Sequence, residues 1–238
     1  MAKSKEAAGL KLRLIAADRL QAVLKGASFS PFTAAEIADP RDRALGNRLV
    51  TTALRYHGPI SKLVDTLLER GLPKKSGRFG AILHLSLGQL LFLPDAGDHS
   101  ALFLAGEAMR ADPKSQHLIK LMNGVLREAQ RRRDSIMLDA SALFPRPLLE
   151  VWRDAYGEAA MRGFAEALLA GAPLDLTLKH GEAGLAAELG GVRLLDDVVR
   201  LDRRDRPIDQ LAGFATGDWW VQDVAASLPV GRRDHEIQ

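Results

Sequence analysis

Residues 77–94, with the sequence GRFGAILHLSLGQLLFLP, constrain the fold most strongly, because this segment is apolar on nearly all sides. A helix without a polar face must be surrounded by other elements to be stable in water. We therefore predict a central buried helix from about Gly77 to Leu93 that ends at Pro94. The segment is shorter than the roughly 20 apolar residues of a membrane span, which favours a place in a protein core.

The segments around this helix have the apolar periodicity of amphipathic helices. Apolar residues recur at helical spacing from Leu12 to Leu20, and Asp39-Pro40 supplies an N-cap and a first-turn proline for the next helix. We expect Gly58-Pro59 to end that second helix. Short loops and the lack of a strand pattern predict an all-α helical bundle for residues 1–140. The predicted helices cover about residues 8–25, 40–57, 60–70, 77–93, 99–111 and 114–133.

The pattern changes after about residue 140. Two helices are followed by a segment of alternating polar and apolar residues, a short helix and a second strand, an order typical of a small α+β domain. These elements are predicted at about residues 148–156, 158–170, 174–179, 181–191 and 192–201. We expect a connecting domain over residues 141–216. Residues 217–238 would then begin a further element that is incomplete or faces a partner.

Several kinds of active site are excluded because the sequence lacks the residues or motifs that they need. The chain has no cysteine, no G-x-x-x-x-G-K-[ST] loop and no G-x-G-x-x-G after a strand. The six histidines share no short ligand spacing, and we interpret His84 as a core residue. We therefore predict no catalytic, cofactor-binding or metal-binding residues. Because the N-terminal residues lack the apolar core of a signal peptide, we expect a cytoplasmic protein without a membrane segment.

Positive charge is concentrated in the first half of the chain. Residues 1–140 contain 22 Lys and Arg against 14 Asp and Glu, a net charge of +8, whereas residues 141–238 have a net charge of −5. A basic helical domain is a candidate for binding a polyanion. The alternative is an ordinary solvated surface, on which nearby acids pair with these cations.

A stripe of arginines favours the polyanion. Three arginines of the second helix are spaced by seven and share one helical face, and a guanidinium fork suits phosphate. Because aromatic stacking platforms are not evident, we expect structured RNA that is recognised by shape and phosphates. The predicted phosphate contacts are Lys11, Arg13, Arg41, Arg48, Arg55, Arg131, Arg132 and Arg133.

Six strings of the chain occur in the order found in one protein family. They are DRALGNRLVTTALR (42–55), AILHLSLGQLLFLP (81–94), LIKLMNGVLRE (118–128), FPRPLLEVWRDAYG (144–157), APLDLTLK (172–179) and LAGFATGDWWVQDVAASLP (211–229). Together they resemble the N-terminal part of the bacterial ribosomal RNA cytosine-C5 methyltransferases of the Sun/Fmu/RsmB type. The resemblance implies a NusB-like RNA-binding bundle followed by a small α+β connecting domain.

The resemblance also implies what this chain lacks. In that family the segment that resembles residues 211–229 leads into a Rossmann-like domain, which binds S-adenosylmethionine and carries two catalytic cysteines. Nothing in this sequence corresponds to those cysteines or to the cofactor loop. We therefore expect a truncated, inactive chain without a cofactor of its own, which positions small-subunit ribosomal RNA for chemistry carried out elsewhere.

Two other interpretations stay open. NusB-like bundles also bind proteins in transcription antitermination, so the chain is alternatively a protein-interaction module that uses the region of Trp219 and Trp220. A working enzyme would instead bind S-adenosylmethionine. Asn123, within one of the family strings, is assigned to helix packing.

Overall fold

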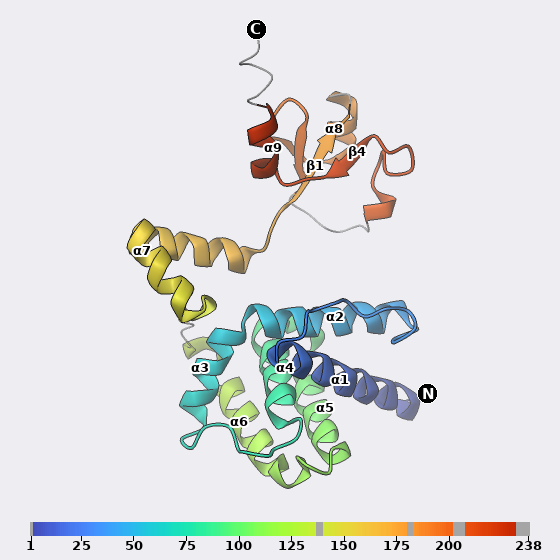
Figure 1. Ribbon diagram of the computed structural model, residues 1–238. Helices are drawn as coiled ribbons and strands as arrows, with labels where there is room; N and C mark the ends of the chain where they lie inside the picture. Colours follow the sequence, from blue (N-terminus) through green and yellow to red (C-terminus); the bar gives the residue numbers. More distant parts are fainter. Residues whose placement is uncertain (1, 137–139, 180–182, 202–207, 232–238) are drawn as a thin grey trace. The chain divides into compact units, whose positions relative to one another are not determined.

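The computed structural model describes residues 2–136, 140–179, 183–201 and 208–231. The chain divides into two compact units, Met1–Leu169 and Ala170–Gln238. The first unit is helical and the second is built on a small sheet (Figure 1). An all-α bundle followed by a small α+β unit is the predicted fold class, and it is confirmed.

The helical unit is organised around α4, as the apolar segment predicted. Every residue from Ala81 to Leu90 is buried, and α1, α2, α5 and α6 all contact this helix (Figure 1). The helices of the unit are α1 (Ala2–Leu24), α2 (Pro40–Arg55), α3 (His57–Leu67), α4 (Phe79–Phe92), α5 (Asp98–Ala111), α6 (Ile119–Arg131) and α7 (Arg146–Ala170). Short 3-10 turns are η1 (Pro94–Ala96), η2 (Gln116–Leu118), η3 (Arg133–Ser135) and η4 (Ala140–Leu143).

The start of α2 follows the predicted capping pattern. The Asp39 side chain accepts hydrogen bonds from the backbone N–H groups of Arg41 and Asp42, and Pro40 occupies the first turn. The prediction that Gly58-Pro59 separates two helices was wrong, since both residues lie in the first turn of α3. Proline is tolerated there. Glycine is required at position 58, because a Cβ would lie 1.7 Å from the carbonyl oxygen of Ala142 in η4.

The two helices predicted on either side of residue 157 are the two halves of α7. Gly157 has a φ of 79°, which bends the helix between them. Phe144, Met161 and Ala165 form a small separate core here, with Trp152 packed against it. The first compact unit of the structure thus includes nearly all of α7, and the expected domain boundary at residue 140 stays a prediction.

The second unit contains a four-stranded antiparallel sheet in the order β2-β3-β1-β4. Its elements are β1 (Leu174–Leu178), α8 (Ala183–Leu189), β2 (Val192–Arg193), β3 (Val198–Leu201), η5 (Ile208–Gln210), β4 (Trp219–Val221) and α9 (Val224–Gly231). The single strand predicted over residues 192–201 was wrong. It is a hairpin, because Asp196 and Asp197 form its turn. β4 pairs with β1 and completes this sheet.

Candidate nucleic-acid interface

The arginine stripe predicted on the second helix lies on α2. Arg41, Arg48 and Arg55 are all exposed. Arg48 donates two hydrogen bonds to Asp95, at 2.5 and 2.8 Å, and this contact raises the pKa of Arg48 and lowers that of Asp95. Within the described residues Arg41 and Arg55 make no side-chain ion pair. Two of the three arginines are thus free of ion pairs within the described residues.

The arginines at the end of α6 are paired with acids. Arg131 and Arg132 both contact Glu128, and Arg133 contacts Asp98 at 2.7 Å. Surface ion pairs of this kind contribute about 0–1 kcal/mol, so a phosphate can replace the carboxylate at little cost. Because Arg131 and Arg132 share one carboxylate, this helix end keeps a net positive charge.

The two predicted contacts on α1 have different surroundings. Lys11 is exposed, but it lines a pocket with three acids, Glu36, Asp39 and Asp42, which offset its charge. Arg13 is only 4% exposed, and its Nη2 donates a hydrogen bond to Gln89. Burial lowers the pKa of Arg13 to about 10. A phosphate on the surface cannot reach this side chain, so Arg13 is corrected to a core residue.

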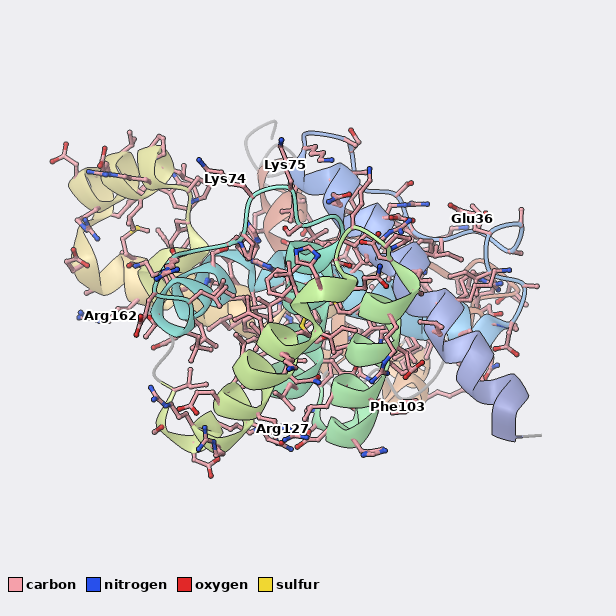
Figure 2. All side chains as sticks on the ribbon, turned by 90° about the horizontal axis from the view of Figure 1, so that it is seen from below. Glu36, Lys74, Lys75, Phe103, Arg127 and Arg162 are labelled. Atoms are coloured by element: carbon pink, nitrogen blue, oxygen red, sulfur yellow. The ribbon has the colours of Figure 1, made fainter. Side chains whose placement is uncertain are left out.

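A cluster of lysines that the sequence pattern did not reveal lies at one end of the bundle. Lys25 follows α1, Lys75 precedes α4 and Lys114 follows α5, and all three line one pocket of about 750 Å³. We call this pocket the lysine basin. Figure 2 shows Lys74 and Lys75 on the loop before α4. No linear spacing connects these positions, and only the packing of α1, α4 and α5 brings them together.

The acids of the lysine basin are already engaged by Arg78. Its side chain donates to both carboxylate oxygens of Asp18, at 2.5 and 2.9 Å, and its backbone N–H donates to Asp112 at 2.9 Å. Burial opposes ionisation of Asp112, but hydrogen bonds from Arg78 and Ser115 outweigh it and lower the pKa of Asp112. Within the described residues the three lysines make no ion pair.

The tryptophan pair of the second unit is split between core and surface. Trp219 is 7% exposed, and its Nε1 donates a hydrogen bond to the carbonyl of Ala212 at 2.6 Å. Trp220 is 45% exposed and donates to Gln222. Only Trp220 of the two is therefore accessible to a partner.

The part of the chain that the structure describes offers neither a metal site nor a membrane span. No group of three or more His, Asp or Glu side chains among these residues could hold a metal ion. None of the helices described combines the length and the apolarity that crossing a membrane requires.

Comparison with known proteins places the helical unit in a family. The sequence pattern of the NusB family matches residues 10–131, which carry the bundle from α1 to α6 and the lysine basin. The chain belongs to the NusB family. A crystal structure described as PH0851 shares the fold with a TM-score of 0.53, at 13% sequence identity, over 93% of this chain and 54% of that chain.

Curated relatives of this NusB-family chain are named for ribosomal RNA methylation. It is 35% identical over 243 residues to ribosomal RNA small subunit methyltransferase B of Xanthomonas campestris, covering 95% of this chain and 54% of the relative. The protein of that name from Shigella flexneri is 31% identical over 236 residues, covering 90% and 53%. A probable one from Synechocystis is 28% identical over 206 residues, covering 79% and 46%. The chain spans about half the length of these relatives.

Proposed function

We propose that the NusB-family unit binds small-subunit ribosomal RNA through its phosphates and positions it for cytosine-C5 methylation. The lysine basin is the observation that carries this proposal. Three lysines from separate segments line this pocket, and its two acids are hydrogen-bonded by Arg78. Arg41 and Arg55 on α2 supply two further exposed cations that make no ion pair among the described residues.

The chemistry of the basin fits a phosphodiester backbone. Lysine ammonium groups act as point charges for phosphate, and their positions fix how an RNA is oriented without reading its sequence. Neutralising phosphates releases counterions, so the affinity would depend steeply on salt. The relatives named for methylation of small-subunit ribosomal RNA make that RNA the first ligand to test.

The methyl-transfer step is assigned to residues outside this sequence. The family it resembles uses two cysteines and S-adenosylmethionine, and this chain contains no cysteine. In the proposed function its own residues bind and orient RNA only. Added to RNA and S-adenosylmethionine, the chain by itself would transfer no methyl group.

A titration of purified protein against a small-subunit ribosomal RNA fragment tests this function. Replacing Lys25, Lys75 and Lys114 together by glutamine should weaken binding at least about 10-fold, because three phosphates are no longer neutralised. The matched control replaces Arg146, Arg153 and Arg162 of α7 by glutamine. It changes the net charge equally, and the affinity should stay within about 2-fold of wild type. Equal losses of affinity in both variants would rule out the lysine basin as the interface.

A protein-binding role is the second candidate, and the surface of β4 favours it. Trp220 and Val221 are 45% and 54% exposed on an edge strand of the sheet. Exposed apolar side chains on an edge strand are typical of interaction surfaces. If this role holds, nuclease-treated protein should capture a partner that the variant Trp220→Ser does not. Capture that disappears with nuclease treatment would assign the partner to RNA instead.

A further inference from the structure

A groove between α5 and α6 has a composition different from that of the lysine basin. It has a volume of about 540 Å³, which lies in the range of small-ligand sites. Its walls include His99, Phe103 and Gly106 from α5, and Asn123 and Arg127 from α6. Figure 2 shows Phe103 and Arg127 at the outer surface of the helical unit. The groove therefore combines aromatic, amide and cationic groups.

One wall of the groove is a pair of stacked rings. The rings of His99 and Phe103 are nearly parallel, with centroids 6.0 Å apart and an interplanar angle of 13°. Phe103 is 39% exposed although it is large and apolar. An exposed aromatic face is a platform on which a nucleic-acid base can stack. The spacing of four residues places both rings on one face of α5, but the sequence did not show that Phe103 stays exposed on that face.

The opposite wall offers polar groups that the protein does not use itself. Within the described residues Asn123 makes no side-chain hydrogen bond and Arg127 makes no ion pair. Glu107 is the acid that lines the groove, and it is paired with Arg110. A carboxamide can both donate to and accept from the edge of a base, and a guanidinium suits phosphate.

Glycine at position 106 keeps the space between these groups open. A Cβ added there would lie 3.8 Å from Nη1 of Arg110 and 3.9 Å from Oδ1 of Asn123, which is ordinary contact distance. The Cβ of a longer side chain at position 106 would therefore fit without displacing α5, and the rest of that side chain would enter the groove. This position allows the groove to be blocked while its functional groups stay in place.

We propose that the α5–α6 groove holds one unpaired nucleotide of the bound RNA. The base stacks on Phe103, its polar edge faces Asn123, and the adjacent phosphate contacts Arg127. This inference rests on the proposed function, and it adds recognition of an unpaired nucleotide to the backbone contacts of the lysine basin. It assigns Asn123 to binding, in place of helix packing.

Two RNAs of equal length test the proposal, a hairpin with an unpaired loop and a fully paired duplex. Wild-type protein should bind the hairpin more tightly. Phe103→Ala and Gly106→Leu should each lower the hairpin affinity roughly 5- to 100-fold, the range expected when one base no longer stacks, and leave the duplex affinity unchanged. Phe214→Ala, which removes an exposed ring of the second unit, is the control and should change neither affinity. Circular dichroism and thermal unfolding establish that each variant is folded.

The outcomes separate the two proposals. If wild-type protein binds neither RNA, the proposed function fails and this inference fails with it. If both RNAs bind equally and Phe103→Ala changes neither affinity, RNA binding stands and the nucleotide site is overturned. Cytidine and adenosine monophosphates are added as competitors. If they bind in a Phe103-dependent way while the hairpin shows no preference, the groove takes free nucleotides and the RNA assignment is overturned.

Discussion

Single residues show where a prediction of RNA contacts from side-chain charge alone was misleading. Arg13 was expected at the RNA surface, yet it lies between α1 and α4 with two of its nitrogens unpaired. Its place in the helix pointed to burial, since Ala16, Ala17 and Leu20 follow it by three, four and seven residues and all are buried. Helical phase, rather than residue type, decides which cations are available to a ligand.

Arg13→Met should leave RNA affinity unchanged and the protein at least as stable. The lowering of the Arg13 pKa to about 10 corresponds to a burial penalty of about 3 kcal/mol. The hydrogen bond to Gln89 that methionine cannot make contributes about 1 kcal/mol. Denaturant unfolding and an RNA titration measure the two quantities. A several-fold fall in affinity in a fully folded variant would return Arg13 to the interface.

A second residue-scale prediction concerns His84, which is 3% exposed in α4 beside His57. Burial lowers the pKa of both imidazoles below the ordinary 6.5, so the folded state favours their neutral forms. Below pH 6.5 the unfolded chain takes up protons that the folded chain does not, so stability falls as the pH drops through this range.

The variant His84→Gln should therefore lose less stability than wild type between about pH 7 and about pH 5. The carboxylates of lowered pKa start from 3.8, or from 4.5 for Glu36, and they are present in both proteins, so their contribution does not distinguish the variant from wild type. Thermal unfolding at the two pH values measures the difference. An identical pH dependence of stability in both proteins would show that protonation of His84 does not cause the loss of stability.

At the scale of elements, hydrophobic periodicity predicted which elements form better than it predicted where they begin and end. The apolar segment of α4, the Asp39 cap of α2 and the two halves of α7 all follow from local sequence. The start of α3 and the hairpin of β2 and β3 were not predicted from the local sequence. At Gly58 the outcome depends on a close approach to Ala142, and in the hairpin the local turn signal of Asp196 and Asp197 lies between two apolar segments that together have the pattern of one strand. The contact of Gly58 is made by the fold and leaves no local period in the sequence.

Gly77 gives a test of one such close approach. Its φ is +58°, and a Cβ would lie 2.4 Å from Oδ2 of Asp112 and 2.8 Å from Cβ of Lys114. Gly77→Ala should therefore destabilise the protein by more than about 2 kcal/mol, through backbone strain and displacement of Asp112. Gly71→Ala is the control, because Gly71 has a φ of +64° with no atom within 4 Å of an added Cβ. It should cost only about 1 kcal/mol, and equal costs in denaturant unfolding would mean that the contact with Asp112 is unimportant.

At the scale of the whole molecule, the excess of positive charge was visible in the sequence but the place of the proposed binding surface was not. The eight predicted cations include one buried and four paired residues. The lysine basin instead joins positions 25, 75 and 114, which are far apart along the chain. Long-range packing creates this site, so no motif could reveal it.

The proposed lack of a cofactor site in this chain also belongs to this scale. S-adenosylmethionine should not raise the melting temperature of the protein, because the sequence contains no cofactor loop of the kind found in the family it resembles. A ligand at 100 times its Kd would stabilise the folded state by about 2.7 kcal/mol, which a thermal scan detects readily. A saturable increase would assign a cofactor site to this chain.

The salt dependence of RNA binding tests the central claim most directly. With the lysine basin and the two α2 arginines on phosphates, the slope of log K against log salt should be about −3 or steeper. Replacing Lys25, Lys75 and Lys114 by glutamine should make it shallower by about 2 to 3, near one unit for each phosphate that a lysine no longer neutralises. A slope near zero, or one that the three replacements leave unchanged, would contradict phosphate binding at the lysine basin.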